Sequence, residues 1–242
     1  MPRLHGPIVV FVTLMAACTN KTPQTVSLAN YPTLQQTTDY TCGCVSALTV
    51  MRYYGICDES ESGLATKMHT HVDSHTPNAA PGSAVCLTDF GTSVAELYRY
   101  FAQRSDFNIV ASSFCPYDSL SLLDDTSLVG ALAVGNVKPQ FDDYGDAALF
   151  FHRHLEAGRP IMVCWNLWGG HWTVCTGYSD NGTPDCYDDD LLTMADPYDS
   201  IDGHPDGFSQ VSLVGFFYDW FCTMTPKPWQ LQPYLIVEPS KE

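Results

Sequence analysis

Apolar residues in the first half of the chain recur with the period of an α-helix. The clearest set predicts a helix that starts at Cys42 and ends at Gly55, with one apolar stripe at Cys44, Ala47, Leu48 and Met51. A capping box of Ser93 and Glu96 predicts the start of another helix. The helices predicted after the first cover about residues 64–71, 93–104, 146–157 and 213–220.

The second half of the chain differs, because short runs of apolar, β-branched and aromatic residues replace the helical period. These runs predict strands at residues 161–165, 172–178, 191–195 and 234–237. Since helices come mostly before strands, the order predicts an α+β fold, in which an N-terminal helical half packs on a C-terminal antiparallel β-sheet. Residues 108–143 mix short apolar runs with Asp and Gly and predict no element.

Composition is typical of a globular protein with one domain. Of 242 residues, 45% are hydrophobic, 12% are aromatic and only 16% are charged, so the chain can bury a sizeable core. The formal net charge of −16 disfavours nucleic acid and anionic membrane surfaces as partners, because both would repel the protein. Nothing in the composition predicts an oligomeric state.

The first 18 residues are typical of an export signal. Arg3 gives a positive start, and residues 7–17 carry no charge but are too few to span a bilayer. The segment ends in a sequence similar to a bacterial lipobox, with Met15 where leucine is usual, which predicts a lipid anchor in the cell envelope at Cys18. Ordinary secretion and a retained segment remain alternatives. We expect three parts: a signal peptide over 1–18, a tether over 19–30 and one domain over 31–242.

Export would make the cysteine content informative. Setting aside Cys18 as the anchor and Cys42 as a candidate nucleophile, eight of the ten cysteines remain: Cys44, Cys57, Cys86, Cys115, Cys164, Cys175, Cys186 and Cys222. An oxidising envelope would allow up to four disulfides among them, whereas in an anaerobe most could stay as buried thiols. No CxxC pair occurs, so we expect no structural zinc site.

Acyl transfer by a thiol requires a nucleophile, a base, a group that orients the base, and a donor for the oxyanion. Cys42 starts a predicted helix, where the helix dipole and unpaired N–H groups stabilise a thiolate. His171 follows two glycines at the start of a predicted strand and is the candidate base. Asp196 ends a strand before Pro197 and can accept a hydrogen bond from the imidazole. Gln36, six residues before Cys42, can place its amide beside the backbone N–H of the cysteine.

The segments that contain these residues resemble a known family. They are, in chain order, QTTDYTCG at 36–43, MRYYG at 51–55, GTS at 91–93, GRPIMVCWNLWGGHWTVCTGY at 158–178 and MADPYD at 194–199. Together they are similar to the cysteine peptidases that process bacteriocins at double-glycine leaders, and more closely to free-standing relatives of those peptidases. The resemblance covers about residues 31–238.

The resemblance implies a papain-like fold in which the helix with the nucleophile packs on the sheet. It implies that Cys42 is the nucleophile, His171 the base, Asp196 the orienting group and Gln36 the oxyanion donor. The expected activity is hydrolysis of peptide or amide bonds in a peptide or protein substrate, outside the cytosol, with no metal or cofactor. Two alternatives remain: an endopeptidase or transpeptidase of cell-wall peptides that uses the same acyl-enzyme, and a catalytically silent binding module of the same fold.

Three departures from the family pattern leave rival assignments. Cys44 stands where the free-standing relatives commonly have proline, so it is a second candidate nucleophile. Gln35 is a rival oxyanion donor, one residue out of register. The interval between His171 and Asp196 is longer than is usual, and Asn166 is the nearest substitute if the aspartate is displaced.

Other groups of residues suggest ligand sites but are interpreted more simply. The histidines outside the proposed site are expected to be polar surface residues and not metal ligands: His69, His71, His75, His152 and His154. An acidic run hints at calcium but lacks the spacing of an EF-hand loop, so we expect a solvated loop: Asp196, Asp199, Asp202 and Asp206. Three tryptophans near His171 could line a cleft or pack on the strand: Trp165, Trp168 and Trp172.

Overall fold

A computed structural model describes residues 24–70, 91–114, 139–183, 186–224 and 230–241. The export signal and anchor expected in residues 1–18 lie outside this part of the chain, as do His71 and His75. Within it the fold is α+β, as the sequence predicts.

The described residues form five α-helices and one short 3₁₀ helix: α1 (Cys42–Tyr53), α2 (Glu61–Lys67), α4 (Val94–Ala102), α7 (Tyr144–Glu156), η1 (Leu167–Gly169) and α8 (Leu213–Asp219). α1 begins at Cys42 as predicted, and α4 begins at the predicted capping box. α2 starts and ends earlier than the predicted 64–71, because the Ser60 side chain caps it by accepting from the Gly63 N–H at 3.1 Å. None of the helices in these ranges is both long and apolar enough to cross a membrane.

Seven strands form one antiparallel sheet in the described part of the chain: β1 (Thr25–Ser27), β2 (Phe107–Ser112), β3 (Ile161–Trp165), β4 (His171–Ser179), β5 (Leu191–Ala195), β6 (Phe208–Ser212) and β7 (Tyr234–Pro239). The strand order is β2-β7-β3-β4-β5-β6, and β1 pairs with the last residues of β4. β4 therefore pairs with three strands and is the centre of the sheet.

The sheet corrects two expectations. β1 and β2 come from the first half of the chain, so the sheet is not purely C-terminal. The expected tether over 19–30 is too long, because Val26 pairs with Tyr178 and the Gln24 N–H donates to Asp180 Oδ1 at 2.7 Å. The sequence did not predict β1, β2 or β6. These strands lie at the margin of the sheet and are partly exposed, so they lack a clear apolar pattern.

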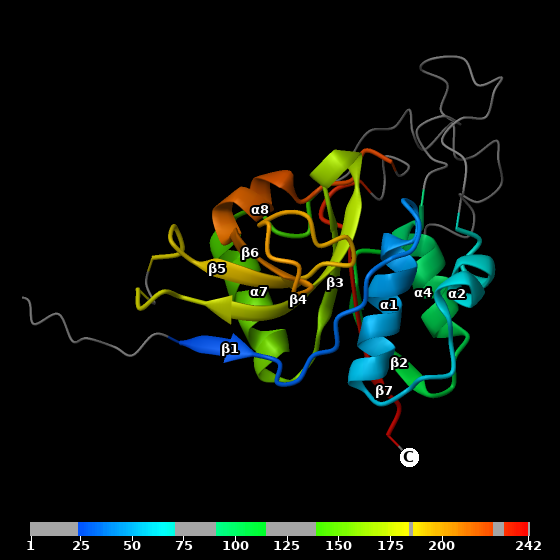
Figure 1. Ribbon diagram of the computed structural model, residues 1–242. Helices are drawn as coiled ribbons and strands as arrows, with labels where there is room; N and C mark the ends of the chain where they lie inside the picture. Colours follow the sequence, from blue (N-terminus) through cyan, green and yellow to red (C-terminus); the bar gives the residue numbers. More distant parts are fainter. Residues whose placement is uncertain (1–23, 71–90, 115–138, 184–185, 225–229, 242) are drawn as a thin grey trace, which may run out of the picture.

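The helices divide into two groups around this sheet. α1 packs on β4, and α4 packs on β2 and β7, whereas α7 packs on β4, β3 and β1 and α8 packs on β6. Figure 1 shows α1, α2 and α4 gathered beside β2 and β7, with α7 and α8 together on the side of β5 and β6. The contact between α1 and β4 matters for the candidate site, because α1 begins at Cys42 and β4 begins at His171.

The apolar residues whose spacing predicted α8 are the ones that pack this helix on α7. Phe216 and Trp220 are almost fully buried and meet Phe151 of α7, with ring centroids 5.7 and 5.3 Å from the Phe151 ring. Burial of aromatic side chains of this size contributes about 2 kcal/mol each to stability, so this cluster holds α8 in place.

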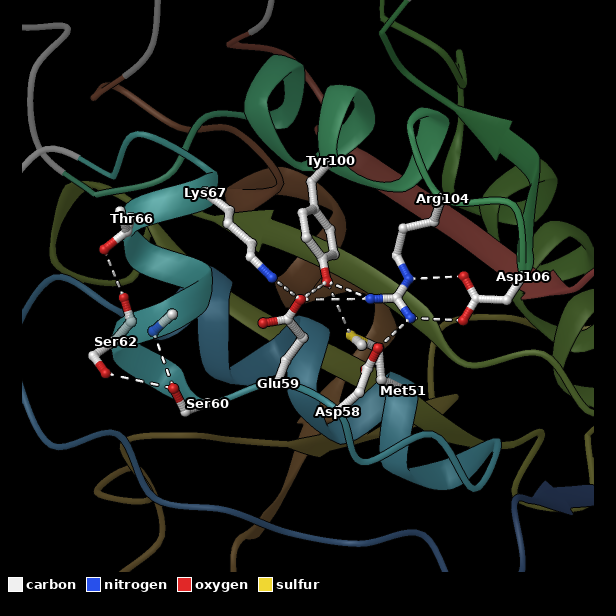
Figure 2. A network of polar contacts seen from close by, with 11 residues as sticks. Met51, Asp58, Glu59, Ser60, Ser62, Thr66, Lys67, Tyr100, Arg104 and Asp106 are labelled. Atoms are coloured by element: carbon white, nitrogen blue, oxygen red, sulfur yellow. Dashed lines mark hydrogen bonds and ion pairs between the residues drawn. The ribbon is translucent and has the colours of Figure 1, made fainter.

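A polar network joins α2 to α4 on the other side of the molecule (Figure 2). Arg104, just after α4, donates to both carboxylate oxygens of Asp106 at 2.8 and 2.6 Å, to Asp58 at 2.8 Å and to the Tyr100 hydroxyl at 2.9 Å. Tyr100 donates to Glu59 at 3.1 Å, and Lys67 of α2 pairs with the same carboxylate. Because the Glu59 side chain is only 7% exposed, these partners compensate a buried charge and fix the position of α2.

Candidate active site

Cys42 lies at the N-terminal end of α1 and is 8% exposed. The residue before it, Thr41, is the N-cap, but its side chain makes no capping hydrogen bond. Its hydroxyl instead donates to Glu61 Oε1 at 2.5 Å. The N–H groups of the first turn are therefore not blocked by the N-cap side chain, and they remain available beside the thiol.

Glu61, the first residue of α2, organises the segment in front of Cys42. Besides the Thr41 hydroxyl, its carboxylate accepts from the Thr37 N–H at 2.8 Å and from the Thr37 hydroxyl at 2.9 Å. These bonds tie α2 to the stretch between Gln36 and Cys42. The sequence analysis missed Glu61, because 20 and 24 residues separate it from its partners and no local pattern signals the contact.

Gly43 allows α1 to approach β4 closely. A Cβ atom at this position would lie 2.9 Å from Thr92 Cβ and 3.1 Å from Trp172 Cδ1, which are distances that side chains avoid. Trp172, the second residue of β4, in turn donates its indole N–H to the Thr92 carbonyl at 2.7 Å. The contact sets the start of α1 against the start of β4, so that Cys42 and His171 face the same space.

His171 begins β4 and is 3% exposed. Its Nε2 donates to Asp196 Oδ1 at 2.7 Å, and the Cys42 thiol lies close enough to the ring to raise the pKa of His171. The same imidazole lines the cavity together with Cys42, so it lies between the cysteine side of the cavity and the carboxylate.

The electrostatics of this trio favour a protonated imidazole. Burial lowers the pKa of His171, but the hydrogen bonds and negative charges of Asp196 and Cys42 outweigh burial and raise this pKa to about 9. Burial likewise raises the pKa of Asp196, but the hydrogen bond and charge of His171 overcome this and hold that pKa below its ordinary value. A charged imidazole and an ionised carboxylate are the expected forms at neutral pH.

Asp196 is held from several sides. Its Oδ1 also accepts from the Tyr198 N–H at 2.8 Å, and its own N–H donates to the Gly207 carbonyl at 2.9 Å. The side chain of Asp196 is fully buried. The long interval between His171 and Asp196 therefore does not displace the carboxylate, because β5 pairs with β4 and returns it to the histidine.

A cavity of about 380 Å³ opens beside Cys42 and His171. Gln36, Trp168 and Tyr198 line it together with the cysteine and the histidine, and both aromatic side chains are about half exposed. The ring of Trp168 stands edge-on to His171 with centroids 5.3 Å apart, and to Tyr198 with centroids 5.2 Å apart. This aromatic pair covers the histidine on its solvent side.

Trp168 has an unusual backbone conformation. Its φ of 54° lies in the left-handed region, which costs a non-glycine residue free energy of order 1 kcal/mol or more. The sequence analysis left open whether the three tryptophans near His171 line a cleft. Trp168 and Trp172 do line the cavity, whereas Trp165 is buried and packs on Phe216.

Gln36 lines the cavity, but its side-chain amide is hydrogen-bonded to the backbone two residues further along the chain. Its Nε2 donates to the Thr38 carbonyl at 2.6 Å, which leaves the second hydrogen of the amide free of that bond. Its backbone N–H donates to the Pro197 carbonyl at 2.8 Å, so the residue is tied to the loop that follows Asp196. Its Oε1 is buried and has no hydrogen-bond partner within the described ranges.

The three rival residues lie elsewhere. Cys44 is fully buried beside Thr70 and Thr92, and burial raises the pKa of its thiol, which makes it a poor thiolate. Gln35 turns its amide to the backbone carbonyl of Asp196 at 3.3 Å. Asn166 precedes η1, and its backbone N–H donates to the Asp219 carbonyl at 2.8 Å. None of the three lines the cavity.

Two further thiols lie in the cavity wall. Cys164 of β3 and Cys222 are both buried and hydrogen-bonded to each other, and burial raises the pKa of Cys164 well above its usual value. Cys222 packs tightly against the backbone before the histidine, since a Cβ at Gly170 would lie 2.5 Å from its Sγ. Cys42 itself carries a free thiol. Cys86 and Cys115 lie outside the described part of the chain.

The other histidines that the structure describes do not line this cavity. His154 was expected at the surface but is buried in α7, where its ring stands 4.7 Å from that of Phe150 and burial lowers its pKa to about 4. His152, on the same helix, packs its ring against Tyr178. Among the residues that the structure describes, no three His, Cys, Asp or Glu side chains come together as metal ligands.

Comparisons with known proteins identify no relative. No family model, no curated protein and no solved structure matches this chain.

Proposed function

We propose that this protein is a cysteine peptidase with a papain-like arrangement of its site. The observation that carries the proposal is the imidazole of His171, which shares the wall of one cavity with Cys42 and is hydrogen-bonded to Asp196 Oδ1 at 2.7 Å. A nucleophile, a base and an orienting carboxylate in this order are the parts of a thiol-based catalytic triad.

In the proposed mechanism the His171 imidazolium and the Cys42 thiolate form an ion pair. The sulfur attacks the carbonyl carbon of an amide, and the oxygen becomes an oxyanion that accepts hydrogen bonds from the Cys42 N–H and the Gln36 amide. His171 then gives its proton to the departing amine, which leaves an acyl group on the sulfur. Water, which gives a proton to His171, attacks the acyl carbon; the acid leaves, and the thiolate and the imidazolium are restored.

The cavity is large enough to hold a side chain of the substrate next to the bond that Cys42 attacks. Its volume of about 380 Å³ is in the range of ligand sites, and the free thiol of Cys42 opens into it. An amine that enters in place of water would turn the same acyl-enzyme into a transpeptidase. The free thiol also argues against a silent module whose cysteine is locked in a disulfide.

A labelling experiment tests the proposal without a known substrate. We expect an epoxysuccinyl peptide inhibitor to alkylate Cys42 in the native protein, and the labelling to be lost in His171→Ala. Cys57 is an exposed thiol outside the cavity and is the matched control, since it should not react with this inhibitor at low concentration. Labelling of Cys57 and Cys42 at equal rates would contradict the proposal.

Turnover is then measured with an unfolded protein or a peptide library, and mass spectrometry identifies the products. We expect Cys42→Ala to abolish cleavage while the protein stays folded by circular dichroism. Hydrolysis products indicate a peptidase, and products that carry an added amine indicate a transpeptidase. Full activity in Cys42→Ala would refute the proposed mechanism.

A further inference from the structure

The charges around the cavity suggest which substrates can enter it. Asp39 is exposed at the cavity wall, and among the described lining residues no lysine or arginine occurs. Asp196 supplies a second carboxylate behind His171. The imidazolium of His171 is paired with Asp196, so Asp39 is the carboxylate that faces the cavity among the described lining residues.

The wall beside His171 adds a second feature of a cation site. Trp168 is 56% exposed and Tyr198 is 50% exposed, and their rings meet at 5.2 Å in an edge-to-face pair. Exposed faces of tryptophan and tyrosine attract cations through the quadrupole of the ring. Trp168 lines the cavity from a left-handed backbone conformation, with φ of 54°.

From these features we propose that the cavity selects a cationic side chain, so that the substrates are basic peptides with Lys or Arg next to the cleaved bond. Asp39 supplies the charge and the Trp168–Tyr198 pair supplies the cation–π contact. This inference rests on the proposed function, because the cation is placed beside the bond that Cys42 attacks. The formal net charge of −16 would also draw cationic peptides toward the protein from a distance.

Three small reagents of similar size test the charge preference at Cys42. Each is a methanethiosulfonate, in which the thiolate attacks the sulfenyl sulfur, forms a mixed disulfide and releases methanesulfinate. The reagents carry a trimethylammonium group, a sulfonate group or no charge, and peptide mass spectrometry gives the rate at Cys42 separately from other thiols. The uncharged reagent corrects for differences in the nucleophilicity of the sulfur.

We expect the cationic reagent to modify Cys42 faster than the anionic one, with a ratio that falls toward one at about 1 M salt. Asp39→Asn should lower this ratio by about three- to tenfold, the scale of one nearby charge partly exposed to water. Asp142→Asn is the matched control, because Asp142 is also exposed but does not line the cavity. Trp168→Leu should slow the cationic reagent relative to the uncharged one.

The outcomes separate the two proposals. If Asp39→Asn and Asp142→Asn change the ratio equally, the preference belongs to the whole protein and the local cation site is refuted. If the ratio is one in the native protein, or if Trp168→Leu affects the uncharged reagent as much as the cationic one, the inference also fails. A Cys42 that does not react with the uncharged reagent would instead refute the proposed function. Where peptide cleavage is detected, we expect bonds beside Lys or Arg to be cut first.

Discussion

Asp196 should control the protonation of His171, and Asp196→Asn tests this with little change in shape. The replacement keeps an oxygen at the Oδ1 position, which accepts from His171 Nε2 at 2.7 Å and from the Tyr198 N–H at 2.8 Å. It removes the negative charge and puts an NH2 group in place of Oδ2, which is buried and has no hydrogen-bond partner among the described residues. The imidazole should therefore keep its orientation and lose part of the stabilisation of its charged form.

The expected size follows from the pKa of His171. A rise from the ordinary 6.5 to about 9 corresponds to about 3.4 kcal/mol of net preference for the imidazolium, at about 1.36 kcal/mol per pKa unit. A charge-assisted hydrogen bond is about twice as strong as a neutral one, so loss of the charge should remove at least about 1.4 kcal/mol of this preference. We expect the midpoint of the His171 titration to fall by one pH unit or more in Asp196→Asn.

Nuclear magnetic resonance of isotope-labelled histidine measures the midpoint directly. His171→Gln identifies the signal among the eight histidines. If cleavage is detected, the alkaline limb of kcat/KM should move to lower pH by the same amount, because His171 must be protonated to donate to the leaving amine.

Asp199→Asn is the matched control, since Asp199 lies three residues further along the same loop and accepts from the Gly207 N–H at 2.7 Å, with no bond to His171. An unchanged His171 midpoint in Asp196→Asn would refute the reasoning, and so would an equal shift in Asp199→Asn.

Three other predictions concern the oxyanion donor, the helix contact and a buried histidine. Gln36→Ala should lower kcat by about 10²-fold with little effect on KM, the scale of one lost oxyanion donor; an effect on KM alone would contradict this role. Gly43→Ala should lower the free energy of unfolding by about 1–3 kcal/mol, measured with urea, because its Cβ would lie 2.9 Å from Thr92 Cβ. The control Gly215→Ala meets no atom closer than 3.7 Å and should not destabilise the protein. His154 has a pKa of about 4 when folded and about 6.5 when unfolded, so the unfolded state binds its proton first. Stability should fall by about 2 kcal/mol as pH drops from 6.5 toward 4, and His154→Leu should reduce this loss; an unchanged pH dependence would contradict it.

Much of the fold follows from local patterns in the sequence. β3 and β5 have the predicted bounds, and α1 starts at the predicted residue, because buried strands and amphipathic helices carry strong apolar periods. β1 has only three residues, and its identity as a strand depends on pairing with β4 about 150 residues away. Such a strand has no local signal in the sequence, so the prediction of a tether that extends to residue 30 was wrong.

Some residues of the candidate site could likewise be predicted from the sequence, and others could not. Cys42, His171, Asp196 and Gln36 could be proposed from the sequence because each occupies the end of an element or a fixed offset, and the structure brings all four to one place. Burial ranks Cys44 below Cys42, which spacing alone left open. The contribution of Glu61 and the left-handed backbone of Trp168 depend on distant contacts and on local geometry, which residue type does not reveal.

The antiparallel pairing of β1 with the end of β4 has a practical consequence for attachment of the protein to a surface. His171 and Ser179 are the two ends of β4, and at about 3.4 Å per residue they lie about 27 Å apart. Because β1 pairs with the Ser179 end, the chain enters the sheet about that far from His171, the candidate general base. A bead, an affinity tag or a lipid joined upstream of Gln24 would therefore be held at the far end of the central strand. Immobilisation through this end should leave the cavity facing the solution, where large substrates can reach it.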